Sequence, residues 1–186
     1  MSNVIESTKV VTGIVRFSYA NVFEPKSING SEPKFSVSLL IPKSDTKTIA
    51  AINKAIEAAK QAGIGKFGGK IPAKLKTPIR DGDIDRPEDE AYAGHYFINA
   101  NSSQRPGIVD KNLNPIMDTT EFYSGCYGHA DINFYAFNTK GNKGIACGLN
   151  NLMKTADGEA LAGKASAEVA FAAFVNNNTD DEDFLK

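Results

Sequence analysis

The sequence predicts a mainly β domain with helical additions, built on five strands. Segments of alternating polar and apolar residues recur between turn-forming glycines, prolines and asparagines, and only one segment has clear helical periodicity. The length of 186 residues suits one domain with a substantial core, and the 41% hydrophobic content is that of a soluble globular protein. We predict a folded domain over residues 1–175 and a disordered tail over 176–186.

The first two strands and the helix follow from local patterns. Residues 9–19 alternate as one strand, in which Val11, Val15, Phe17 and Tyr19 share one parity. Residues 24–33 form a loop, and residues 34–41 form the second strand, which Pro42 ends. The helix then begins at Ser44 or Asp45, which can cap its first amides, and ends near Gly63. Its narrow apolar stripe predicts a structural role on one side of a sheet.

Two neighbouring loops carry opposite charge. Residues 60–80 contain four glycines, six cations and no acid, with Phe67 among the glycines. Such a loop either closes over a nucleic-acid strand or is only a solvated flexible connection. Residues 81–90 carry six carboxylates, but glycine and glutamate are absent where a calcium-binding loop needs them. We interpret this second loop as a solvated acidic segment that confines a phosphate ligand to one side.

The third strand covers residues 94–100, and a loop with a short strand at Ile108 and Val109 follows it. Residues 118–124 are predicted to form a helical turn. Residues 165–175 form a short helix or a strand, and the pattern leaves both open.

The segment from residue 122 to residue 154 predicts a long hairpin that supplies the last two strands. One face of its first strand is apolar, whereas the other sets aromatic rings among polar groups. Lys140 and Lys143 lie in the turn. Single-stranded nucleic acid binds to such surfaces because bases stack on rings and phosphates pair with cations. The alternative is that a neighbouring element covers these rings.

No pattern in the chain indicates catalysis or a metal site. Cys126 and His129 lie three residues apart on an alternating strand, so they face opposite ways. We therefore expect no cofactor, no metal and no enzymatic activity. The two cysteines and the absence of a signal or membrane-spanning pattern predict a cytoplasmic protein that does not bind membranes.

The net charge of −1 hides an uneven distribution. The last seven residues contribute −3, so the rest of the chain carries about +2. An acidic tail either competes with phosphates for a basic groove, recruits partner proteins, or only keeps the protein soluble. The tail residues concerned are Asp180, Asp181, Glu182, Asp183 and Phe184.

Five blocks of the sequence resemble a family of single-stranded DNA-binding proteins of tailed phages. These blocks are residues 23–25 (FEP), 32–45 (EPKFSVSLLIPKSD), 79–83 (IRDGD), 94–110 (GHYFINANSSQRPGIVD) and 121–151 (EFYSGCYGHADINFYAFNTKGNKGIACGLNN). The resemblance implies an OB-fold, a small five-stranded barrel, although the helix lies between the second and third strands instead of the third and fourth. It also implies sequence-independent coating of single-stranded DNA during phage replication and recombination, in the cytoplasm of the host. Phe184 is not the last residue, which places in doubt any partner that needs a terminal aromatic.

The predicted site residues come from the pattern of aromatic and basic residues in the sequence and not from the family resemblance. Those predicted to stack on bases are Tyr127, Tyr135, Phe137, Tyr96, Phe97 and Phe67. Those predicted to neutralise phosphates are Lys66, Lys70, Lys74, Lys76, Arg80, Arg105, Lys140 and Lys143. The predicted partners are single-stranded DNA and, through the tail, replication or recombination proteins; a homo-oligomer or a cooperative assembly on DNA is compatible with this role. The alternative function is a phage structural or recombination-partner protein whose aromatic face is a protein interface.

Overall fold

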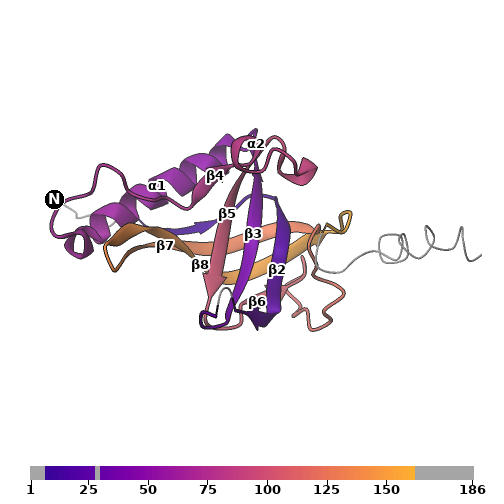
Figure 1. Cartoon of the computed structure of the whole chain (residues 1–186). Helices are drawn as coiled ribbons and strands as arrows, with labels where there is room; N and C mark the ends of the chain where they lie inside the picture. The colour runs from indigo at the N-terminus through magenta and orange to yellow at the C-terminus, as the bar shows by residue number, and fades with distance from the viewer. Residues whose placement is uncertain (1–6, 28–29, 162–186) are drawn as a thin grey trace, which may run out of the picture.

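The computed structural model describes residues 7–27 and 30–161. The predicted element over residues 165–175 and the acidic tail lie outside these residues. The elements in chain order are β1 (Lys9–Val11), β2 (Val15–Lys26), β3 (Lys34–Pro42), α1 (Thr46–Ala62), η1 (Ile64–Phe67), β4 (Ile79–Asp81), α2 (Gly82–Asp85), η2 (Glu90–Tyr92), β5 (His95–Ser102), β6 (Gly107–Val109), β7 (Tyr127–Thr139) and β8 (Asn142–Ala156). Figure 1 shows them with these labels.

Five strands close into a barrel in the order β2, β3, β5, β8 and β7, and β7 returns to pair with β2 at Val15 and Arg16. Only the β5–β8 pairing is parallel within this ring. The short strands β1, β4 and β6 extend the sheet from its edges. The predicted five-stranded OB-like barrel is therefore confirmed, and so is the short strand at residues 108 and 109.

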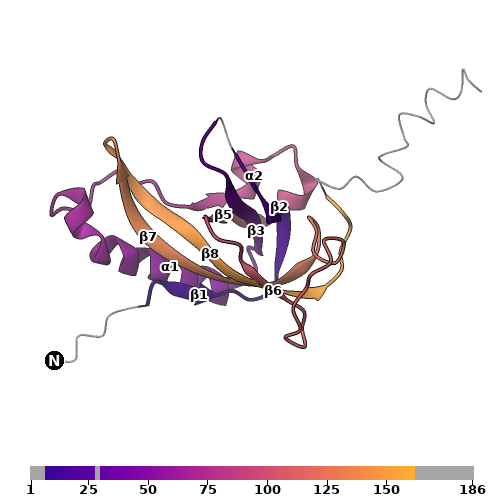
Figure 2. The same ribbon diagram turned by 90° about the horizontal axis from the view of Figure 1, so that it is seen from below.

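The core fills the barrel and continues under α1. Alternate residues of β7 point inward, as the sequence predicts, and Ile132 and Phe134 are at most 1% exposed. The helix begins as predicted, because the side chain of Asp45 accepts a hydrogen bond from the Thr48 amide at 3.1 Å. It ends at Gly63, where a β-carbon would collide with the side chain of Ala136. α1 thus lies along the β7–β8 hairpin (Figures 1 and 2) and precedes the third barrel strand, as predicted.

The expectation of one continuous strand over residues 9–19 is wrong. The chain breaks near Gly13, whose amide donates to the Thr48 hydroxyl at 2.9 Å, and β1 pairs with β7 while β2 enters the barrel. In one continuous strand Val11 would lie on the same face as the buried Val15 and Phe17, but it is 72% exposed because the strand is broken. β2 also continues to Lys26, three residues into the predicted loop. Residues 118–124 form turns and bends instead of the predicted helical turn.

Two hairpins project from the barrel. The β2–β3 hairpin ends around residue 30, and the β7–β8 hairpin ends at the turn of Lys140 and Gly141, both of which have positive φ. Figure 2 shows the tips of both hairpins rising to the same side of the barrel. The surface that lies between their bases is the outer face of β3 and β5.

Candidate nucleic-acid interface

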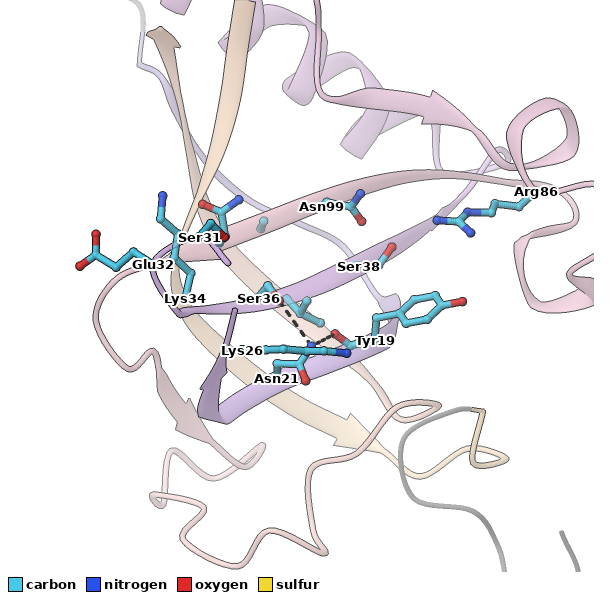
Figure 3. A pocket seen from close by; sticks show the side chains of 13 residues that line it. Tyr19, Asn21, Lys26, Ser31, Glu32, Lys34, Ser36, Ser38, Arg86 and Asn99 are labelled. Carbon is cyan, nitrogen blue, oxygen red and sulfur yellow. Dashed lines mark hydrogen bonds between the residues drawn. The ribbon is translucent and has the colours of Figure 1, made fainter. Parts of the chain in front are cut away.

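A groove of about 670 Å³ lies on the outer face of β2, β3 and β5. Its walls come from these three strands, from the end of the β2–β3 hairpin and from the loop that follows α2 (Figure 3). The lining residues are Tyr19, Asn21, Lys26, Ser31, Glu32, Lys34, Ser36, Val37, Ser38, Arg86, Asn99, Ala100 and Asn101. Most of them are polar or charged, so the residues of this groove differ from those of an apolar small-molecule pocket.

The floor of the groove is a ladder of hydroxyls and amides. Ser36 lies opposite Asn101 and Ser38 lies opposite Asn99 in the β3–β5 pair, so all four side chains share the outer face. The Ser38 hydroxyl is 3.3 Å from the hydroxyl of Tyr92, which packs beside Phe97 on the same outer face. The side-chain amides of Asn99 and Asn101 bond to no other described residue, which leaves their donors and acceptors available to a ligand.

Cations stand at both ends of the groove (Figure 3). Arg86 points over the floor from the α2 side, near the ring of Tyr19, whereas Lys26 and Lys34 form the last strand pair before the loop of the β2–β3 hairpin. Lys34 is four residues from Ser38 along β3, which corresponds to about 13 Å of extended chain. Glu32 also lines the hairpin end, but it offsets only one of the two lysines there, so the groove offers a net positive charge at each end and neutral hydrogen-bonding groups between them.

The acidic segment from residue 81 to residue 90 folds against β3 and β5 through its own carboxylates. Lys43 forms ion pairs with Asp81 and with Asp83, each at 2.8 Å, and these hydrogen bonds raise the pKa of the Lys43 ammonium. The same lysine holds the pKa of Asp83 below its usual value, helped by the Gly94 amide, which donates to this carboxylate at 3.0 Å. These carboxylates thus fix α2 to the barrel, whereas the sequence suggested a solvated loop.

The outer face continues from the groove onto the β7–β8 hairpin. Asn101 of β5 pairs with Gly148 of β8, which in turn lies opposite Asn133 of β7. Two residues further along this face, Tyr135 lies opposite Ala146. We call residues 133–148 the hairpin arm. Because side chains directly across from each other share a face, the ring of Tyr135, 40% exposed, lies on the same side of the sheet as the groove.

Glycine on β8 makes room for aromatic rings on β7. A β-carbon on Gly144 would lie 2.7 Å from the ring of Phe137, so this ring extends across the neighbouring strand. The ring of Phe137 remains half-buried, and burial raises the pKa of the Tyr135 hydroxyl. Both rings therefore present uncharged aromatic surface on the hairpin arm.

The two lysine-rich segments of the sequence meet at the hairpin arm. The Lys66 ammonium donates to the Ala136 carbonyl at 3.2 Å, and the Lys143 ammonium donates to the Phe67 carbonyl at 3.4 Å. Lys76 forms a bridge to Gly144 at the edge of β8. We call the lysines that these two segments carry the lysine cluster: Lys66, Lys70, Lys74, Lys76, Lys140 and Lys143. No acidic residue occurs in residues 58–80 or 132–156, so nothing in these segments neutralises the cluster.

The remaining predicted residues lie elsewhere. Phe67 and Phe97 are only 4% and 2% exposed, because Phe67 packs in the main core and Phe97 is covered by Tyr92, so the structure does not support their stacking on bases. Tyr127 lies at the opposite end of β7 from the arm, with the Arg16 guanidinium 5.3 Å from its ring. Tyr96 occupies the opposite parity of β5 from Asn99 and lies beside Lys43.

The two predicted arginines each have a partner within the protein. Arg80 lies across from Phe97 in the β4–β5 pair and is 3.8 Å from the carboxylate of Asp85. Arg105 donates to the Phe23 carbonyl at 2.7 Å. The structure therefore brings the two lysine-bearing segments into contact through Lys66, Lys76 and Lys143, and neither arginine takes part in these contacts.

The groove itself was missed by the sequence analysis. Its serines and asparagines are common on exposed strand faces, and Arg86 stands alone among carboxylates. Tyr19 has the parity of the buried Phe17, but a register shift follows Ser18, and Tyr19 has a φ of 47°. This bulge turns the ring outward, to 48% exposure. The one sequence signal for the groove was the alternation of serine at 36 and 38 and of asparagine at 99 and 101, on two strands that are adjacent in the barrel.

The described residues provide neither a metal site nor an accessible thiol at this face. Within residues 7–27 and 30–161, no three His, Cys, Asp or Glu side chains form a group that could hold a metal ion. Cys126 and Cys147 are buried, and burial raises the pKa of both thiols. No helix in the described part of the chain is long and apolar enough to cross a membrane.

Solved structures of phage proteins share this fold. The single-stranded DNA-binding protein of bacteriophage Enc34, solved in complex with single-stranded DNA, is 28% identical, with a TM-score of 0.69 over 87% of this chain and 97% of that one. The single-stranded DNA-binding protein gp2.5 of bacteriophage T7 has a TM-score of 0.61 over 90% of this chain and 94% of that one. Its identity of 14% shows similarity of fold alone.

Sequence comparison identifies the family. A protein of Acyrthosiphon pisum secondary endosymbiont phage 1, named putative protein p50, is 32% identical over 173 residues, and the match covers 87% of this chain and 90% of the relative. The family model described as Enterobacter phage Enc34, ssDNA-binding protein matches residues 8–185. The chain therefore belongs to the family of the Enc34 phage single-stranded DNA-binding protein.

Proposed function

We propose that this protein binds single-stranded DNA without sequence preference and coats it during phage DNA replication and recombination. The observation that carries the proposal is the polar groove with cationic ends, which continues onto a ring-bearing, lysine-rich arm. OB-folds bind oligonucleotides on the face of their second and third strands, between the loops that correspond to these two hairpin ends. Membership of the Enc34 family, and the complex of the Enc34 protein with single-stranded DNA, support the same function.

The chemistry of the surface favours single strands over duplexes. The rings of Tyr135 and Phe137 stack only on bases whose faces are free, and each stacked base contributes about 1–3 kcal/mol. The amides of Asn99 and Asn101 both donate and accept hydrogen bonds, so they can contact the edges of any unpaired base. Nothing in this arrangement selects one base strongly, which fits a coating protein.

Phosphate neutralisation is assigned to the lysine cluster and to the cations at the ends of the groove. Each phosphate contact releases counterions, so affinity should fall as salt rises. Tyr127, Tyr96, Arg80 and Arg105 lie away from this path or pair with other groups, and we assign them no contact with DNA.

The acidic tail acts, in this proposal, either as a competitor for the cationic surface or as a docking site for replication proteins. Its four consecutive acids carry the charge that a phosphate competitor needs. The proposed site of action is the cytoplasm of the infected host, and the protein has no catalytic role. A homo-oligomer or cooperative binding along DNA is compatible with coating.

The proposal is tested by a fluorescence-anisotropy titration of labelled oligo-dT and of a matched duplex, at low and at high salt. We expect tight binding of oligo-dT that weakens with salt, and much weaker binding of the duplex. Equal affinity for the two ligands would contradict the proposal, and the aromatic face would then be tested as a protein interface.

A further inference from the structure

Arg86 occupies an unusual position at one end of the groove. Its guanidinium lies 5.8 Å from the ring centroids of Tyr19 and Tyr92 and 5.9 Å from that of Phe97. Tyr92 and Phe97 are buried and meet edge to face at 5.0 Å, so they form a rigid base beneath the cation. Cation–π contacts of this kind hold a guanidinium in place without neutralising its charge.

Four of the six carboxylates in residues 81–90 contact groups other than Arg86. Asp81 and Asp83 bind Lys43, and Asp85 lies near Arg80. Asp89 accepts a hydrogen bond from the Ala91 amide at 3.1 Å. The Arg86 guanidinium has no hydrogen bond or ion pair to any described residue, although this segment contains six acids. A half-buried arginine whose five donors remain free is a ready site for an anion.

The backbone on both sides of the groove holds this arrangement in place. The Arg86 amide donates to the Gly82 carbonyl at 3.0 Å and thereby ends α2. Tyr19 adopts a φ of 47°, which residues with a side chain rarely do, at the register shift of β2. Such backbone conformations persist where the surrounding structure enforces them, often at functional sites.

We propose that Arg86 and Tyr19 form one nucleotide subsite, in which the guanidinium binds a backbone phosphate of single-stranded DNA and the exposed ring of Tyr19 stacks on the adjacent base. Arg86 lies over the ring of Tyr19, and this ring is 48% exposed, so one face remains open to a base. The subsite rests on the proposed function, and it identifies where in the groove a strand is anchored. Planar, bidentate recognition of phosphate is the particular strength of arginine.

The first test measures oligo-dT affinity of Arg86→Gln and Arg86→Lys over a range of salt concentrations. We expect Arg86→Gln to bind about tenfold more weakly at low salt and to reduce the slope of log K against log salt by about 0.7. Arg86→Lys should keep the slope because the charge remains. It should bind more weakly because an ammonium cannot form the two parallel hydrogen bonds that a planar guanidinium donates to a phosphate. Lys111→Gln removes the same charge from an exposed loop outside the groove and should match wild type.

The second test uses the absence of tryptophan from the chain. Tyr19→Trp introduces a single tryptophan at the subsite, which can be excited selectively over the tyrosines, and Tyr127→Trp introduces one at the far end of β7 as a control. Base stacking should quench the fluorescence of the first variant in a saturable titration with oligo-dT and leave the second unchanged. In the Tyr19→Trp background, Arg86→Gln should shift the midpoint of quenching about tenfold to higher DNA concentration.

The outcomes separate this inference from the proposed function. Failure of the wild-type protein to prefer oligo-dT over duplex would reject the proposed function itself. If wild type binds but Arg86→Gln retains its affinity and salt slope, only the subsite is rejected. Thermal melts accompany each variant: a lower melting temperature with weaker binding but an unchanged salt slope would mean that Arg86 has a structural role, and would overturn the phosphate contact.

Discussion

Removing one lysine from each segment of the lysine cluster tests whether the two segments act on DNA together. Lys70 belongs to the glycine-rich loop and Lys140 to the turn of the hairpin arm. Both side chains are exposed, and neither ammonium bonds to another described residue. The double variant Lys70→Gln, Lys140→Gln should therefore leave folding unchanged. Glutamine keeps the β-carbon that lysine has at the positive φ of position 140, so the turn is not strained further.

The expected magnitude follows from counterion release. Each lost phosphate contact on single-stranded DNA lowers the slope of log K against log salt by about 0.7, so two lost contacts lower it by about 1.4. Between about 50 and about 200 mM salt, the wild type should lose about sevenfold more of its affinity than the variant does. At low salt the variant should bind more weakly than wild type, and at high salt the two should converge.

The assay is an anisotropy titration of labelled oligo-dT at four or more salt concentrations. The matched control is the double variant Lys47→Gln, Lys111→Gln, which makes the same change in net charge at exposed positions of α1 and of the loop after β6. Equal slopes for the two double variants would refute a local role of the lysine cluster, because only the overall charge would then matter. A slope change of half the expected size would mean that only one segment contacts DNA.

Three further predictions concern the ring, the tail and the thiols. Tyr135→Ala should weaken oligo-dT binding by about 1–3 kcal/mol and lower the free energy of unfolding by less than about 1 kcal/mol, measured by titration and urea melts; a larger loss of stability would identify the ring as core. Deleting residues 180–186 removes a charge of −3 and should tighten oligo-dT binding at low salt; unchanged affinity would indicate a solubilising tail. Cys126 and Cys147 should resist Ellman's reagent in the folded protein, because burial raises the pKa of both thiols and blocks access, and both should react after unfolding; fast reaction in the native state would contradict the packing.

The sequence alone predicted the barrel strands and the helix because their patterns are local. Alternation fixes which side of β7 is buried, and a carboxylate at position 45 with a glycine at position 63 bounds α1. The error at residues 9–19 has a physical cause. At Gly13 the chain leaves the pairing of β1 with β7 and enters the barrel as β2. Val11, which would face the core in one continuous strand, is therefore exposed. Pairing between distant segments decided that point, and local patterns do not encode it.

The candidate site was only partly predictable for the same reason. The lysines of residues 66–76 and of the hairpin turn each had a visible signal, but their contact depends on how η1 packs against β7. The groove depends on cross-strand register, because Ser36 and Asn101 are far apart in sequence and directly opposite in space. Arg86 gave no sequence signal, since its lack of a carboxylate partner follows from where Lys43 and Arg80 lie.

The distribution of charge over this surface implies that the lysine cluster and the groove contribute differently to DNA binding. The hairpin arm and the loop that packs against it together carry the six lysines of the lysine cluster, so they should dominate the salt dependence and the rate of encounter. The groove has few cations, but its Arg86 is held against three rings, so it should contribute a short, geometrically defined contact. Charge variants of the arm would then change mainly the salt slope, whereas Arg86→Lys would change affinity at constant slope. One set of salt titrations can therefore distinguish contacts of the lysine cluster, which change the slope, from the contact of Arg86, which changes affinity at constant slope.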